Sequence, residues 1–204
     1  MESKTQWQIL LAIIFGVLLL IPIGTLIYIT PATALDAIIR LSALWGFVGL
    51  TVSSIVNLNK RILYQKFGLK FMQLHHGLAI FSLAMATLHP VAFAIKTMSI
   101  LVFIPDFSSW YNFWLLGGRP ALIILYIAVI AALFRKKSKK AWKYIHMLIY
   151  VVLVLILVHG IMIGTDFQSI IILILFSVLS LGAFLTFLYL RTNSLGILSK
   201  KKEK

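Results

Sequence analysis

Cysteine is absent from this 204-residue chain, and acidic residues are scarce, with only five Asp and Glu in total. Without cysteine the chain can form no disulfide, no cysteine-ligated iron–sulfur cluster and no thiolate metal site. The sequence also contains no GxGxxG nucleotide-binding motif and no nucleophile or acid–base dyad of the kind that hydrolases use. These absences exclude hydrolytic and nucleotide-dependent chemistry carried out by the residues of this chain.

Apolar residues dominate what is present. They make up 61% of the sequence, well above the roughly 45–50% of soluble domains. Because about 20 apolar residues cross a bilayer as one helix, the runs predict membrane spans. The six expected spans cover about 7–30, 36–58, 72–95, 118–134, 142–164 and 168–190. We therefore predict an all-α, integral membrane bundle of six transmembrane helices, forming one domain over 1–204 with its core at about 36–190.

The basic residues predict how this bundle is oriented. Most of them lie in the second-to-third connection, in the fourth-to-fifth connection and after the sixth span: Lys60, Arg61, Lys66, Lys70, Arg135, Lys136, Lys137, Lys139, Lys140, Lys143, Arg191, Lys200, Lys201, Lys202 and Lys204. The opposite connections carry only Lys96 and Arg119, with Arg40 near a span end. The positive-inside rule then places both termini in the cytoplasm, with 191–204 as a basic tail beside anionic lipid. The pattern indicates a multi-pass protein of the cell membrane, not a nucleic-acid-binding protein.

The longest connection, about 96–117, is expected on the outer side and is rich in aromatic residues: Phe103, Phe107, Trp110, Tyr111, Phe113 and Trp114. One interpretation is an interfacial aromatic belt or a short re-entrant helix at the lipid headgroups. The other is a lid over an outer cofactor or acceptor site. The sequence leaves both interpretations open.

Four of the five histidines lie inside two of the predicted spans. His75 and His89 are 14 residues apart in the third span, and His146 and His159 are 13 apart in the fifth. An ionisable side chain in lipid is costly, so it marks a functional site by default. At 1.5 Å per residue the members of each pair lie roughly 20 Å apart, one near each membrane face. Opposed imidazoles at matched depths suit the axial positions of a haem iron, so we predict two stacked haem sites.

Helical phase separates the neighbouring histidines. Fourteen steps of about 100° return to within roughly 40° of the starting face, so His75 is the better partner of His89 on that face than His76. We expect His76 to assist a ligand or a haem propionate, or to act as an alternative ligand. The 13 steps from His146 to His159 leave an offset of about 140°. That offset requires a local helix irregularity, or ligation from different sides of the helix.

Other residues near the histidines are candidate contributors to these sites. Arg119 and Lys96 on the outer side, and Arg61 on the inner side, are candidates to pair with haem propionates, because arginine forks onto carboxylates well. The inner cations equally suit a docking surface for an acidic partner, or topology alone. Gly77 and Gly160 admit either a flat macrocycle or close helix packing.

The segments LHHGLAIFSLAMATLHP and WKYIHMLIYVVLVLILVHG resemble the ferric-reductase-like transmembrane domain superfamily. That superfamily includes ferric reductases, NADPH oxidases and the haem subunit of the bacterial methionine sulfoxide reductase system. Its pattern is two histidines on the third helix and two on the fifth, with a WxxxH motif that Trp142 and His146 reproduce. The resemblance covers about 60–190.

The resemblance implies an inner haem b held by His75 and His146 and an outer haem b held by His89 and His159. Electrons would pass from the cytoplasm to an external acceptor, such as ferric iron, oxygen or a periplasmic or extracellular reductase. Relatives carry a flavin domain after the sixth helix, whereas this chain ends shortly after it. We therefore expect a separate flavoprotein, bearing FAD or FMN, or a membrane quinol as donor. The chain would then be part of an enzyme only as the haem subunit of a complete transmembrane oxidoreductase.

The alternative function is a small transporter that moves protons or metal ions through intramembrane histidines. Such transporters usually also place carboxylates inside the membrane. Here the non-terminal acids Asp36, Asp106 and Asp166 fall in outer connections or at span edges. Their placement favours electron transfer over transport, and a purely structural subunit would leave the histidines unexplained.

Overall fold

The computed structural model describes the chain except for residues 1–3, 57–59, 69, 139 and 195–204. Within the described residues every regular element is helical and none is a strand. The elements are α1 (Lys4–Tyr28), α2 (Ala34–Ile55), α3 (Lys60–Phe67), α4 (Phe71–Thr97), η2 (Ile100–Phe103), α5 (Trp110–Leu115), α6 (Gly118–Leu133), α7 (Arg135–Ser138), α8 (Ala141–His146), α9 (Ile149–Ile163), η3 (Thr165–Gln168) and α10 (Ile170–Ser194).

In the part of the chain that the structure describes, four stretches of helix are long and apolar enough to cross a membrane: Ala34–Ile55, Phe71–Thr97, Ala141–Ile163 and Ile170–Thr192. The predicted all-α membrane bundle is therefore confirmed, and so are four of its six predicted spans, by length and composition. Two further apolar stretches found among the described residues are shorter than a typical span: Gly16–Tyr28, which is part of α1, and Gly118–Leu133, which is α6. The crossing of the membrane by these two, and the side on which the termini lie, stay predictions.

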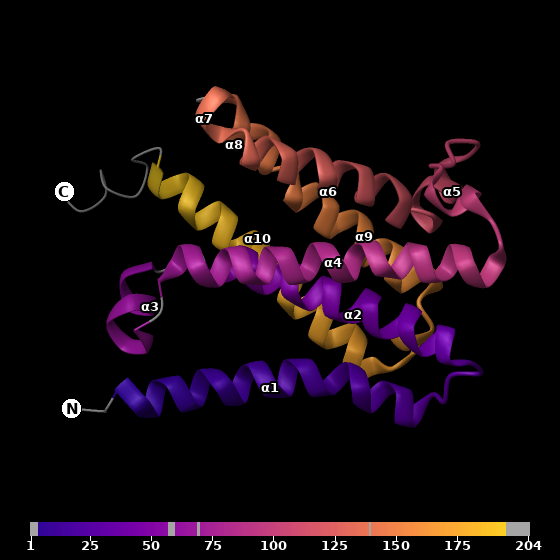
Figure 1. Cartoon of the computed structure of the whole chain (residues 1–204), viewed down its shortest axis with the longest axis horizontal. Coiled ribbons are helices and arrows are strands. Elements are labelled where there is room, and N and C mark those ends of the chain that lie inside the picture. The colour runs from indigo at the N-terminus through magenta and orange to yellow at the C-terminus, as the bar shows by residue number, and fades with distance from the viewer. Residues whose placement is uncertain (1–3, 57–59, 69, 139, 195–204) are drawn as a thin grey trace.

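The helices run roughly along one direction and separate the connections into two ends (Figure 1). α1 begins and α10 ends at the same end of the bundle, near which α3 and α7 also lie. We call this the basic end, because exposed cations such as Lys70, Lys136 and Lys140 gather there. The α1–α2 connection and α5 lie at the other end, which we call the acidic end because Asp36 and Asp106 belong to it.

Glycines let α2 lie directly against α4 in the middle of the bundle. A Cβ atom at Gly46 would lie 3.1 Å from the backbone nitrogen of Ala86, and one at Gly49 would overlap the Ser82 hydroxyl. Small residues at such contacts are typical of helix pairs in lipid, where close approach provides the packing energy. This contact holds the helix that carries His75 and His89 in a fixed position against α2.

The run that carries His146 and His159 is not one regular helix. α8 ends at His146 and α9 begins at Ile149. Across the break, two amides donate to carbonyls three residues earlier: Leu148 to Ile145 at 3.0 Å and Tyr150 to Met147 at 3.1 Å. Such 3₁₀ steps turn the chain by about 120° instead of 100° each, so each one reduces the offset of about 140° by about 20°. This is the irregularity that the 13-residue spacing requires.

Candidate functional site

Each of the four predicted histidine ligands has its Nδ1 atom against an oxygen of a neighbouring segment. The partners are the Ser53 hydroxyl at 2.9 Å from His75, the Ile39 carbonyl at 2.9 Å from His89, the Ala128 carbonyl at 3.1 Å from His146 and the Leu115 carbonyl at 2.7 Å from His159. Since a carbonyl only accepts, Nδ1 carries the hydrogen in the last three. That tautomer has its lone pair on Nε2, which is how metal-binding histidines are commonly held.

The inner pair brings two rings to a distance that suits one metal ion. The ring centroids of His75 and His146 lie 6.3 Å apart, with their planes at 82°. Two imidazoles that bind a single ion from opposite sides, with bonds of about 2 Å, have centroids roughly 6 Å apart. Aromatic rings flank the pair, with Phe71 stacked at 5.5 Å from His75 and Trp142 at 6.2 Å from His146. The helices thus bring together the two histidines predicted for the inner site.

His76 lies outside this arrangement. Its side chain is exposed, and its ring centroid lies 6.0 Å from that of His75. The position is compatible with an assisting role beside His75, which stays a prediction. Arg61 falls in α3, but its side chain lies outside the described part of the structure.

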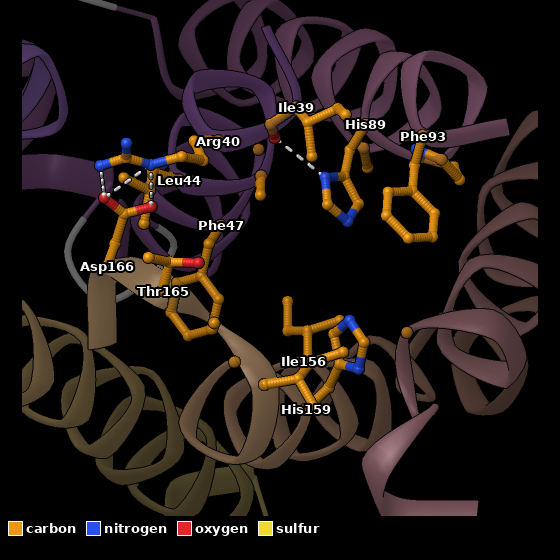
Figure 2. A pocket seen from close by; sticks show the side chains of 18 of the residues that line it. Ile39, Arg40, Leu44, Phe47, His89, Phe93, Ile156, His159, Thr165 and Asp166 are labelled. Atoms are coloured by element: carbon orange, nitrogen blue, oxygen red, sulfur yellow. Dashed lines mark hydrogen bonds and ion pairs between the residues drawn. The ribbon is translucent and has the colours of Figure 1, made fainter. Parts of the chain in front are cut away.

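The outer pair lines a cavity of about 660 Å³ between α2, α4, α6 and α9. Figure 2 shows the rings of His89 and His159 on opposite sides of this space, with Phe47, Phe93 and Ile156 beside them. Most of the lining is apolar. Cavities of roughly 300–1,000 Å³ with apolar walls and a few polar groups are typical of cofactor sites. The size and the apolar lining of this cavity are those that a flat, largely apolar ring system would require, with one imidazole on each side.

The start of α6 sets the position of the His159 ring. A Cβ atom at Gly118 would lie 3.0 Å from Nε2 of His159, and one at Gly117 would lie 3.1 Å from the Leu155 carbonyl. The Leu115 carbonyl, just before these glycines, accepts the hydrogen bond from Nδ1. The turn between α5 and α6 therefore cradles the ring, a role that the sequence analysis missed although the Gly–Gly dipeptide marks it.

The two glycines that follow the histidines differ in their surroundings. A Cβ atom at Gly160 would lie 2.7 Å from the Phe167 ring, so this glycine allows η3 to pack on α9. A Cβ atom at Gly77 would meet nothing within 4 Å. Close packing is therefore the interpretation that the structure supports at Gly160, whereas Gly77 borders open space.

The predicted outer cations also line the cavity. Lys96 pairs with Asp36, and Nη1 of Arg119 donates to the Ile104 carbonyl at 2.9 Å. Both residues line the same cavity as His89 and His159. Their pairing with haem propionates stays a prediction.

A buried ion pair that the sequence analysis missed closes the same cavity. Arg40 donates to Asp166 through Nε at 3.0 Å and through Nη2 at 2.5 Å. It also donates to the carbonyls of Ile29 at 2.5 Å and Thr25 at 3.2 Å. One guanidinium therefore joins the end of α1 and the connection before α10 to α2. Arg40 and Asp166 are 126 positions apart in the sequence, and no local pattern predicts their contact.

Within the described residues, no three side chains of the metal-binding types gather into a closed metal site. Instead, His75 lies near His146, and His89 faces His159 across the cavity. Two side chains per site are what a haem needs from the protein, because its ring supplies the other ligands.

Residues 42–157 match the sequence profile of a family described as the ferric reductase like transmembrane component. The chain belongs to this family. No curated protein and no solved structure matches the chain. The predicted superfamily is thus confirmed, and the ferric-reductase-like chain is a membrane electron-transfer component. The matched segment contains His75, His89 and His146 and ends two residues before His159.

Proposed function

We propose that this ferric-reductase-like component binds two b-type haems and carries electrons across the cell membrane. His75 and His146 would hold the inner haem, and His89 and His159 the outer one. The observation that carries the proposal is the hydrogen bonding of all four Nδ1 atoms to oxygens of neighbouring segments. A histidine that only packs in a membrane bundle has no reason to present the same nitrogen in every case.

The protein's part in the reaction is to hold and orient these imidazoles. A bond from Nδ1–H to a carbonyl fixes the tautomer, limits ring rotation and makes Nε2 a stronger donor. When bound, haem supplies the one-electron redox chemistry. Apolar side chains make up most of the wall around His89 and His159, and charged groups such as Arg119 and Lys96 line the rest of the cavity.

The spacing of the two sites supports passage across the membrane. Thirteen or fourteen residues of helix correspond to roughly 20 Å, against a hydrocarbon core of about 30 Å. Two centres at these depths would cover most of the apolar layer. We also propose that α1, which has 25 residues, and the shorter helix α6 cross the membrane, which gives six spans.

The charge at the two ends supports a direction for electron flow. Exposed cations at the basic end favour the cytoplasm by the positive-inside rule and suit an acidic flavoprotein as donor. A membrane quinol is the other donor that we propose. The outer cavity extends to polar residues such as Thr165 and Lys96, where an external acceptor can approach. Ferric iron, oxygen and an external reductase are the proposed acceptor classes.

The test is the visible spectrum of protein produced with haem supplied, oxidised and reduced. We expect a b-type spectrum with two haems per chain. Single His75→Ala or His146→Ala substitutions should remove the same spectral component, and His89→Ala or His159→Ala should remove the other. His76→Ala distinguishes the two roles expected for His76, because loss of an assisting residue leaves both haems bound, whereas loss of a ligand removes the inner haem.

Two outcomes would contradict the proposal. One is colourless protein under haem-replete conditions, and such protein would next be assayed for proton or metal-ion flux in liposomes, because the alternative function is transport. The other is spectral loss in a pattern that does not separate into these two pairs.

A further inference from the structure

The segment around α5 displays an uncovered apolar face at the acidic end of the bundle. The side chains of Phe107, Trp110 and Tyr111 are 72%, 74% and 63% exposed. Between Lys96 and Arg119 the chain contains no basic residue, and Asp106 is its only acidic one. Soluble proteins rarely expose a contiguous aromatic face with so little charge, and such faces usually mark a contact with a partner or a membrane.

Hydrogen bonds hold this segment in one shape. The Ser109 hydroxyl accepts from the Asn112 amide at 3.0 Å and caps α5, and Asp106 accepts from the Ser108 amide at 2.8 Å. Hydrogen bonds from Ser108 hold the pKa of the Asp106 carboxyl below its usual range, so it stays ionised at neutral pH. The aromatic face is therefore part of a preformed element.

The opposite face of α5 is packed into the bundle. Phe113 and Trp114 pack against the apolar core to which α6 and α9 contribute. Trp110 contacts both of these rings, with centroids 5.7 Å and 5.6 Å away. The carbonyl of Leu115, at the end of α5, accepts the hydrogen bond from His159. Whatever holds Trp110 in place therefore also steadies this carbonyl.

The length of α6 determines the depth of α5. Its 16 residues extend about 24 Å, whereas the hydrocarbon core is about 30 Å thick. After Phe134, cations follow in α7 (Arg135–Ser138), and these belong at the basic membrane surface. The start of α6 then lies a few ångströms inside the opposite boundary. α5, which directly precedes it, lies at that boundary and not beyond it.

We propose that Phe107, Trp110 and Tyr111 insert into the lipid headgroup boundary at the acidic end and so anchor the carbonyl that positions His159. The occupant of this face is phospholipid, because aromatic residues prefer that boundary and the face offers almost no charge with which a protein partner could pair. The neighbouring helices α4 and α6 also expose apolar side chains, such as Ile95 and Ile123. The lipid contact depends on α6 crossing the membrane but not on haem binding, whereas the link to His159 rests on the proposed haem function.

The experiment uses the absence of cysteine, since any cysteine introduced is unique. The variant Trp110→Cys is spin-labelled in phosphatidylcholine liposomes, and its collisions with oxygen and with a water-soluble nickel chelate are measured. Ile127→Cys, in the middle of α6 and 48% exposed, is the deep reference, and Lys140→Cys is the aqueous reference. We expect the label at position 110 to fall between the two, with nickel accessibility several-fold below that of Lys140→Cys.

Each other outcome counts against the proposal. Nickel accessibility equal to that of Lys140→Cys would show a solvent-exposed face. Poor access for both reagents would show that protein, such as a second copy of this chain, covers the face. Tyr111→Cys repeats the measurement if Trp110→Cys does not assemble. Parent protein that is colourless under haem-replete conditions, together with a label at the boundary in Trp110→Cys, would contradict the proposed function and leave the lipid contact intact.

Discussion

His75 differs from the other three predicted ligands in the partner of its Nδ1 atom. The Ser53 hydroxyl lies at 2.9 Å, nearer than the Ser53 carbonyl at 3.3 Å, whereas the other three use a carbonyl alone. The hydroxyl is buried, with Ser53 only 3% exposed. A side-chain partner can be removed by substitution, and a backbone carbonyl cannot.

We predict that Ser53→Ala weakens the inner haem site alone. Loss of a hydrogen bond that orients a ligand typically lowers metal affinity by roughly 10- to 100-fold. Inner haem should therefore dissociate at least several-fold faster, measured as haem transfer to an apoprotein acceptor, and its midpoint potential should shift. Ser54→Ala is the matched control, because the Ser54 hydroxyl only donates to the Leu50 carbonyl in its own helix. Equal loss of both haems would refute a local role for Ser53.

A second prediction at this scale concerns Gly118. A methyl group there would lie 3.0 Å from Nε2 of His159, so Gly118→Ala should displace the ring and reduce outer haem content, with the inner haem retained. Gly77→Ala is the control, because a Cβ atom there meets nothing within 4 Å. The measurement is the haem content per chain, taken from the reduced spectrum of each variant. A Gly118→Ala protein with two intact haems would exclude the cradle that we describe.

At the scale of elements, α1, α2 and η3 depend on one buried ion pair. Asp166 is 4% exposed and accepts three hydrogen bonds from Arg40, which also binds two carbonyls near the end of α1. Removing one partner of a buried pair costs about 3–5 kcal/mol, because the other charge is left without compensation.

We therefore predict that Asp166→Asn lowers the thermal stability of the purified protein markedly, as measured by unfolding in detergent. Asp36→Asn is the control, because its partner Lys96 is exposed and water can replace the carboxylate. The control should unfold close to the wild-type temperature. Equal unfolding temperatures for the two variants would show that the Arg40–Asp166 pair contributes no more than a surface pair.

The break between α8 and α9 shows how an element adapts to its ligands. α4 stays helical through Pro90 and presents two histidines 14 residues apart on one face. In the run formed by α8 and α9, His146 and His159 are 13 positions apart, which is one fewer than in α4. The 3₁₀ steps after His146 add rotation and so compensate for part of this difference. Hydropathy alone carries no signal for this break, because an apolar 3₁₀ turn and an apolar α-helix have the same composition.

For the whole molecule, the two ends of the bundle predict its orientation. Thr30, in the α1–α2 connection, and Lys140, before α8, are both exposed and lie at opposite ends. A membrane-impermeant maleimide added to intact cells should label Thr30→Cys and should label Lys140→Cys only after permeabilisation. The cysteine-free parent protein is the background control. The reverse pattern would place the basic end outside and overturn the predicted topology.

Much of this molecule was predictable because lipid imposes simple rules on sequence. Apolar runs predicted the spanning helices, and four of them are long enough in the structure. His75, His89, His146 and His159 stood out because polar side chains are costly in such runs. The run at 118–134 was predicted as a span, but the helix that it forms, α6, has only 16 residues. After Leu133 the apolar run contains only Phe134 before the cations begin.

Sequence by itself determined the class of protein, its family and the four histidines, because each of these depends on residue types at regular spacing. The tertiary structure alone decided which oxygens hold the Nδ1 atoms, how Gly118 cradles His159 and how Arg40 reaches Asp166. The physical reason is that every residue has a backbone carbonyl, so the identity of an acceptor leaves no mark in the sequence. Contacts between residues far apart in the chain form only when the packing of helices brings them together.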